Sequence, residues 1–243
     1  MNDLFRPTGI QRMSLEGNAL EADHLAKETL LHLQDNAGTF VSLLGTPSDL
    51  EPLFFGHCIN EGIGVPEAVA LTITSTLEGG YYVQSKEHLV ERSEASNTNR
   101  IVTTSCGACD APGLDDLIEG LPLFDGGFQH VDLQVLATGF EQMKAQQLGF
   151  TATGGMHGAA LYTATDGIVH LAEDIGRHNA VDKVVGMDWM AEEPSLNPIL
   201  FLSGRCGWDI VAKAARAGIG TIACVGACST LAADTARSLH MRI

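Results

Sequence analysis

The C-terminal part of the chain carries the pattern that most limits how it can fold. The apolar run from Pro198 to Ser203 predicts a buried strand, and Trp208 to Ala217, closed by Gly218, predicts a helix. A second buried strand from Thr221 to Val225 and a last helix from Leu231 to Ser238 follow. This succession favours parallel strands with helices on the faces of their sheet. We therefore predict an α/β fold.

Strand signals dominate the chain before residue 100. Strands are predicted at 28–34, 39–44, 69–75 and 80–84. One amphipathic helix is predicted from Leu50 to Glu61-Gly62. Beyond Asp132, apolar residues at helical spacing up to Met143 predict another helix, and 159–163 and 168–171 predict paired strands.

Charge and cysteine content exclude several classes of protein. The chain has 243 residues with 14 basic and 30 acidic side chains, a formal net charge of −16. That charge would repel a nucleic-acid backbone, although local arginines could still serve one small anion. The first 25 residues contain no apolar leader, and no run of 18 apolar residues occurs, so we expect a soluble cytoplasmic protein without membrane contact. Six cysteines without a secretion signal indicate thiol chemistry or metal binding rather than a disulfide framework.

The stretch from Glu173 to Lys183 is unusually polar for a folded core. Its sequence, EDIGRHNAVDK, has seven of eleven residues that can be charged or donate a side-chain hydrogen bond. A helix would place Asp174, His178 and Asp182 on one face at a spacing of four residues. Such a face either binds a ligand or locks two elements together.

Cys106 and Cys109 form a C-x-x-C pair directly after a further predicted strand at 101–104. The small residues between them allow a tight loop, so either sulfur could be exposed and nucleophilic. A structural or redox pair is the simpler interpretation, and zinc is the competitor. The deaminase zinc pattern is incomplete, because no His-x-Glu lies upstream and Ser105 replaces the usual proline.

Two further segments could bind a ligand. Gly154, Gly155 and His157 belong to a glycine-rich turn that leads into a strand, where a ligand or another backbone could approach closely. Arg205 follows a buried strand, the position where open α/β sheets bind anions. The alternatives are a tight hairpin for the turn, and for Arg205 an ion pair with a carboxylate of the 173–183 motif.

Four of these motifs, in this order, closely resemble the FdhD family, the sulfurtransferase accessory proteins of formate dehydrogenase. They are Cys106-Gly-Ala-Cys109, Thr153 to Leu161, Glu173 to Lys183 and Ser203-Gly-Arg205. The resemblance extends over nearly the whole chain from about Glu28. It implies a cytidine-deaminase-like α/β core with a mixed sheet and flanking helices over residues 101–243. A smaller β-rich region at 26–100 and a flexible N-terminus at 1–25 would precede this core.

The resemblance also implies a function. Such a protein takes sulfane sulfur from a cysteine desulfurase as a persulfide and passes it to the molybdenum or tungsten of a bis(molybdopterin guanine dinucleotide) cofactor before this enters formate dehydrogenase or a related enzyme. A homodimer and no structural metal are expected. Carried over by position, Cys106 bears the persulfide and Cys109 assists it. Candidate cofactor contacts are Gly154, Gly155, His157, Arg177, His178 and Arg205, whereas Asp174, Asp182 and Lys183 are expected to be internal struts.

The chain departs from the family pattern at several positions, which identifies it as a divergent member. Asp110 stands where the family usually has glycine, and Cys206 where alanine is common. Cys228 lies in a segment whose sequence differs from the one usual in the family. Cys206 and Cys228 could receive or relay sulfur, or merely fill spaces for small residues. Two other functions stay open: a non-catalytic chaperone that binds the cofactor, and a zinc-dependent deaminase-like enzyme.

Overall fold

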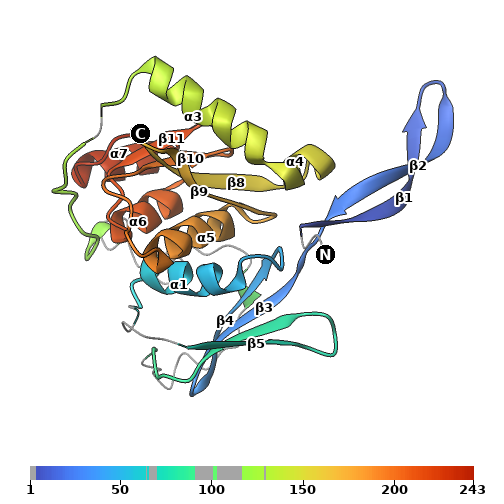
Figure 1. The fold of residues 1–243 in the computed structure, drawn as a ribbon, viewed down its shortest axis with the longest axis horizontal. Helices are drawn as coiled ribbons and strands as arrows, with labels where there is room; N and C mark the ends of the chain where they lie inside the picture. The colour runs from blue at the N-terminus through green and yellow to red at the C-terminus, as the bar shows by residue number, and fades with distance from the viewer. Residues whose placement is uncertain (1–3, 64, 66–69, 91–100, 103–116, 129) are drawn as a thin grey trace.

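The structure, a computed structural model, describes the whole chain except residues 1–3, 64, 66–69, 91–100, 103–116 and 129 (Figure 1). The C-terminal part is built on a four-stranded sheet with the order β11-β10-β8-β9. Its strands are β8 (His157–Thr163), β9 (Gly167–Asp174), β10 (Ile199–Leu202) and β11 (Thr221–Cys224). β10 and β11 are parallel, and β8 is antiparallel to both β10 and β9. The α/β class and the mixed sheet are confirmed.

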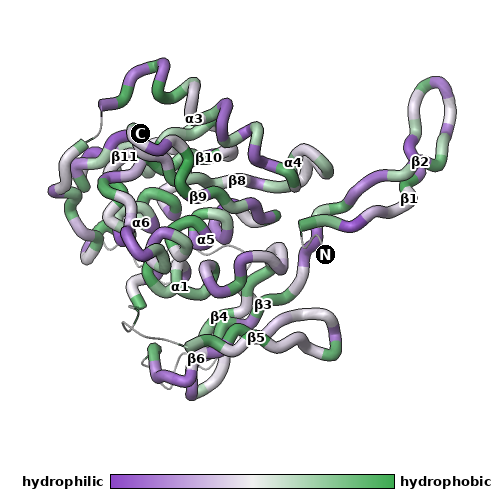
Figure 2. The backbone as a smooth tube through the Cα atoms, viewed as in Figure 1, coloured by the Kyte–Doolittle hydropathy of each residue, from purple (hydrophilic) through white to green (hydrophobic). Residues whose placement is uncertain are grey.

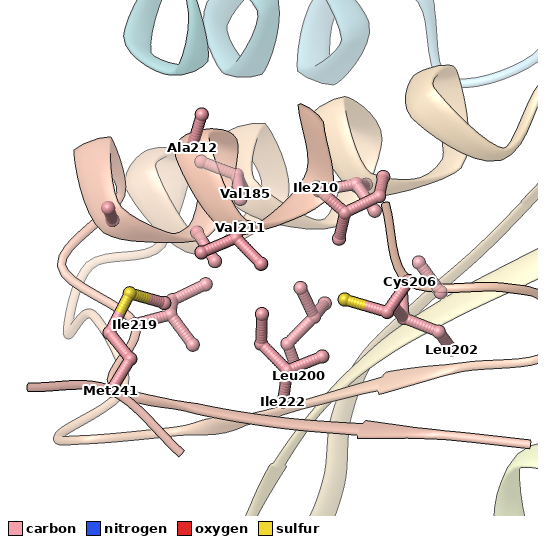
Figure 3. Packing of buried hydrophobic residues seen from close by; sticks show 14 of the residues in the cluster. Val185, Leu200, Leu202, Cys206, Ile210, Val211, Ala212, Ile219, Ile222 and Met241 are labelled. Carbon is pink, nitrogen blue, oxygen red and sulfur yellow. The ribbon is translucent and has the colours of Figure 1, made fainter. Parts of the chain in front are cut away.

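Helices cover both faces of this sheet (Figure 1). On one face lie α3 (Leu133–Gln146) and α4 (Leu148–Thr153). On the other lie α5 (Arg177–Met190), α6 (Trp208–Arg216) and α7 (Thr230–Ser238). Because side chains alternate along a strand, β10 enters two hydrophobic clusters: Leu200 and Leu202 pack under α5 and α6, as Figure 3 shows, while Ile199 and Phe201 pack against α3.

The N-terminal part is rich in β-strands, as predicted, and its five-stranded sheet has the order β5-β6-β3-β4-β7. Its strands are β3 (Thr29–Asp35), β4 (Gly38–Gly45), β5 (Leu71–Ser75), β6 (Tyr81–Ser85) and β7 (Ile101–Val102). The predicted helix is α1 (Leu50–Asn60), which covers this sheet with its apolar side chains. The expected boundary between residues 100 and 101 would separate β7 from its partner β4, so the division into domains stays a prediction.

α1 also packs closely against α5 and so connects the two sheets (Figure 1). Two glycines make this approach possible. A β-carbon at Gly56 would lie 1.7 Å from the carbonyl oxygen of Asp182, and one at Gly186 would lie 1.9 Å from that of Pro52. Only glycine fits at such distances, and the close contact brings the polar side chains of the two helices together.

The N-terminal segment contains strands that the sequence did not predict. β1 (Phe5–Ser14) and β2 (Gly17–Ala26) form an antiparallel hairpin that extends from the body (Figure 1), and the flexibility expected of residues 1–25 stays a prediction. Its side chains are mostly exposed and mix hydrophilic and hydrophobic residues (Figure 2). Since burial does not impose an alternation of polar and apolar residues here, the sequence carries little strand signal.

Asp174 lies outside the helix predicted for it. It was expected on the same helix as His178 and Asp182, but it is the last residue of β9, and α5 begins only at Arg177. Gly176 precedes the helix in an extended conformation, and its N–H donates to the Asp174 carboxylate at 2.7 Å. None of the helices in the described part of the chain is long and apolar enough to cross a membrane.

Candidate functional site

The loops at one end of the strands of the C-terminal sheet bring the two predicted ligand-binding segments together. Since β8 is antiparallel to β10, the start of β8 lies beside the end of β10. Gly158 donates its N–H to the Ser203 hydroxyl at 2.8 Å, and Ser203 donates its own N–H to the Gly158 carbonyl at 3.0 Å. Gly226, after β11, donates to the carbonyl of Gly204 at 3.1 Å. This end of the strands, hereafter the strand-end rim, therefore joins the glycine-rich turn to the Arg205 loop.

A cavity of about 450 Å³ opens at the rim. Gly154, Gly155 and His157 line it from the turn, with Ser203 and Val225 from the strand ends. Both glycines are exposed, and Gly154 has a left-handed backbone with a φ of 65°. A larger cavity of about 680 Å³ lies at the other end of β8, by Thr163, and includes none of the predicted site residues.

His157 is the first residue of β8 and is half-buried at the cavity wall. Burial lowers the pKa of His157 from its usual value, and the positive charges of Arg177 and Arg205 lower it further. We infer that the imidazole is neutral at pH 7, so it can both donate and accept a hydrogen bond.

Arg205 is exposed, and no residue in the described ranges forms an ion pair with it. The alternative prediction, a carboxylate partner from the 173–183 motif, is therefore not realised among them. Asp174 and Asp182 pair with lysines instead. Arg205 is available to an anion at the rim.

Arg177 opens α5 and lies near enough to His157 to affect its pKa. Its Nη2 donates to Asp209 at 3.2 Å, while its buried Nε has no hydrogen-bond partner within the described residues. The side chain is about one-third exposed, at 31%. Asp209 therefore holds one end of the guanidinium, and the exposed part of the side chain remains open to a ligand.

His178 is less open than expected. It is 5% exposed, and its Nε2 forms a hydrogen bond with the Asp209 carboxylate. Burial by itself raises the pKa of Asp209, but His178 and Arg177 lower it below its usual value, so the carboxylate is ionised. This contact holds Asp209 against Arg177. Sequence reasoning missed Asp209, because nothing in its sequence context marks a carboxylate in the first turn of α6 as a partner of α5.

The other polar residues of the motif form buried contacts, as expected of internal struts. Lys183 donates to Asp174 at 2.7 Å, with both side chains fully buried. Asp182 accepts from Lys213 at 2.8 Å and from the amide of Asn60 at 2.7 Å, and His57 lies 3.2 Å away. These contacts connect α5 to α1 and α6, so the motif locks two parts of the molecule together.

Cys106, Cys109 and Asp110 lie outside the described residues. The other four cysteines are free thiols: Cys58 and Cys206 are buried, whereas Cys224 and Cys228 are partly exposed. Burial, with the charges of Asp182 and Asp35, raises the pKa of Cys58 to about 12. Within the described ranges, no three histidine, cysteine, aspartate or glutamate side chains are arranged to hold a metal ion.

Comparison with known proteins finds relatives that match most of the chain. The model of the FdhD/NarQ family matches residues 26–243. The sulfur carrier protein FdhD of Burkholderia mallei is 32% identical over 259 residues, which cover 100% of this chain and 94% of the relative. FdhD of Sulfurisphaera tokodaii is 32% identical, covering 91% and 85%, and that of Nocardia farcinica is 34% identical, covering 96% and 86%.

One solved structure has a similar fold. It is the crystal structure of a proposed formate dehydrogenase accessory protein from Desulfotalea psychrophila, with a TM-score of 0.70 and 23% sequence identity. The match covers 97% of this chain and 90% of that one.

Proposed function

Since the chain belongs to the FdhD/NarQ family, we propose that it is a sulfur carrier that serves a formate dehydrogenase or a related molybdenum or tungsten enzyme. It accepts sulfane sulfur from a cysteine desulfurase and transfers it to the metal of a bis(molybdopterin guanine dinucleotide) cofactor, which is its substrate. The observation that carries this proposal is that two arginines, Arg177 and Arg205, act on His157 in the wall of a cavity, in a protein of net charge −16.

The sulfur chemistry is assigned to Cys106. Its thiolate attacks the terminal sulfur of the desulfurase persulfide, so the S–S bond of the donor breaks and Cys106 carries a persulfide. If the Cys109 thiolate then attacks the inner sulfur of Cys106, hydrosulfide leaves and the two cysteines form a disulfide. That step supplies the two electrons that reduce sulfane sulfur to sulfide. Reduction of the disulfide restores the carrier.

The strand-end rim is assigned to the nucleotide part of the substrate. Arg205 is exposed, and the Arg177 side chain is about one-third exposed, so both guanidinium groups can donate to phosphate oxygens. A β-carbon at Gly154 would meet nothing within 4 Å, and one at Gly155 would meet only Thr153, at 3.8 Å, so the turn leaves space for a ligand. His157 offers a neutral imidazole. The apolar wall of the cavity, with Phe140 and Phe150, suits a flat base.

Replacing Arg205 by alanine should weaken the binding of guanosine diphosphate about 10-fold, which corresponds to the loss of one charge-assisted hydrogen bond. Titration calorimetry at low ionic strength measures the dissociation constant. Arg237→Ala is the matched control, because Arg237 is also an exposed arginine but pairs with Asp234 on α7. Equal affinity of the Arg205→Ala variant and the wild type would contradict the assignment of Arg205.

The homodimer, the desulfurase and the cytidine-deaminase-like core remain predictions. Sedimentation of the purified chain tests the dimer. Co-purification with a cysteine desulfurase or a molybdenum or tungsten enzyme tests the partners. Stoichiometric zinc in the purified protein would instead favour the deaminase alternative.

A further inference from the structure

Three of the six cysteines gather at the carboxyl ends of the two parallel strands. Cys224 ends β11, and Cys206 and Cys228 lie in the loops that follow β10 and β11. All three belong to, or pack against, the hydrophobic cluster under α6 and α7. The cavity at the rim includes none of these three residues.

The backbone holds Cys206 and Cys228 directly side by side. Cys206 donates its N–H to the carbonyl of Ala227 at 3.2 Å, and Ser229 donates to the carbonyl of Cys206 at 3.1 Å. These bonds make Cys206 and Cys228 partners in an isolated parallel bridge. Paired strands lie about 4.7–4.9 Å apart, within the range of roughly 4.4–6.8 Å between the α-carbons of a disulfide.

The two thiols differ in exposure in a way that suits stepwise oxidation. Cys228 is partly exposed, whereas Cys206 is 1% exposed, and Figure 3 shows its sulfur directed into the hydrophobic layer. Burial raises the pKa of Cys206, and the neighbouring Cys228 and Cys224 raise it further. A solvent-borne reagent therefore reaches Cys228 first, and Cys206 is the protonated thiol beside it.

We propose that Cys206 and Cys228 are a modification site that reacts with small-molecule disulfides and closes into a protein disulfide. The site is independent of the proposed sulfur transfer. It would link the loop that carries Arg205 to the loop after β11, since Cys206 and Cys228 belong to these two loops.

The reaction consists of two thiol–disulfide exchanges. The Cys228 thiolate attacks a disulfide R–S–S–R, a mixed disulfide forms on Cys228, and one thiolate RS⁻ leaves. The sulfur of Cys206 then attacks the Cys228 sulfur, the protein disulfide forms, and the second RS⁻ leaves with the proton of Cys206. Two protein thiols are oxidised, and the reagent is reduced to two thiols.

Disulfide mapping of the full chain tests this site. The protein is incubated with oxidised glutathione, free thiols are alkylated under denaturing conditions, and the linked peptides are identified by mass spectrometry. We expect a Cys206–Cys228 link in the wild type, and the same link in Cys224→Ser, the matched control. In Cys206→Ala, Cys228 should instead keep glutathione as a mixed disulfide.

A second measurement needs no variant. The oxidised wild type should melt about 4–8 °C higher than the reduced protein, because the link closes a chain segment between the two loops. The proposal is overturned if wild-type Cys228 stays unmodified, carries only glutathione, or is linked to a cysteine other than Cys206.

Discussion

Replacing Cys106 by alanine should lower the formate dehydrogenase activity of cells that depend on this chain by on the order of 10³-fold or more, because the thiol that carries the sulfur is lost. The measurement is enzyme activity in extracts of a strain lacking its own carrier and complemented with each variant. Immunoblotting confirms equal amounts of the variants.

Cys224→Ala is the control for this experiment. Cys224 is another partly exposed thiol, its pKa is raised chiefly by burial, and no step of the proposed transfer uses it. Activity should stay near the wild-type level. Full activity of Cys106→Ala would instead favour the chaperone alternative, in which the chain only binds and shields the cofactor.

Replacing Asp182 by asparagine should lower the free energy of unfolding by about 3–5 kcal/mol, because Lys213 loses its closest buried carboxylate. Lys213 is 1% exposed, and its one remaining charged partner among the described residues would be Glu61, at 2.7 Å. His57 would lose an ionised neighbour as well. Urea unfolding at pH 7 measures the difference.

The control is the same substitution at an exposed ion pair. Asp234 pairs with Arg237 at 2.7 Å, and both side chains are more than two-thirds exposed. Asp234→Asn should change the free energy of unfolding by less than about 0.5 kcal/mol. Similar losses in the two variants would contradict the stabilising role of the buried network.

The pH dependence of the Asp182→Asn effect has a defined sign. Burial raises the pKa of Asp182, but Lys213 and the hydrogen bond with His57 outweigh it and lower the pKa to about 2. An unfolded aspartate titrates near about 3.9. The stability that Asp182 contributes is therefore fully present above about pH 4 and is lost as the pH falls through about 2. The two proteins should converge in stability over that range.

The regular elements of the core were predictable because their sequence signals are local. The apolar runs at 199–202 and 221–224 are bounded by glycines and polar residues, and the helix after each run has a clear apolar face. Parallel pairing of β10 and β11 then follows, because the helix α6 connects the end of one strand to the start of the next. Ser229 caps α7, since its hydroxyl accepts from the N–H of Ala232 at 3.1 Å.

The candidate site was predictable only in part, because its partners are distant in sequence. Arg205 was predicted at the end of a strand, and in the structure it lies near His157 of the glycine-rich turn. His157 lines the cavity. The partners Asp209 and Lys213 could not be found, because acidic and basic residues on a helix are most often solvated. The N-terminal hairpin escaped prediction for a related reason: its side chains are mostly exposed, so no core dictates their pattern.

The most direct test of the account is the mass of the intact protein after incubation with a cysteine desulfurase and cysteine. We expect a gain of one sulfur atom, located on Cys106 by peptide mapping, removed by a reducing thiol, and absent from Cys106→Ala. A wild-type protein without a sulfur adduct on Cys106, under conditions where the desulfurase is itself persulfidated, would contradict the role as a sulfur carrier.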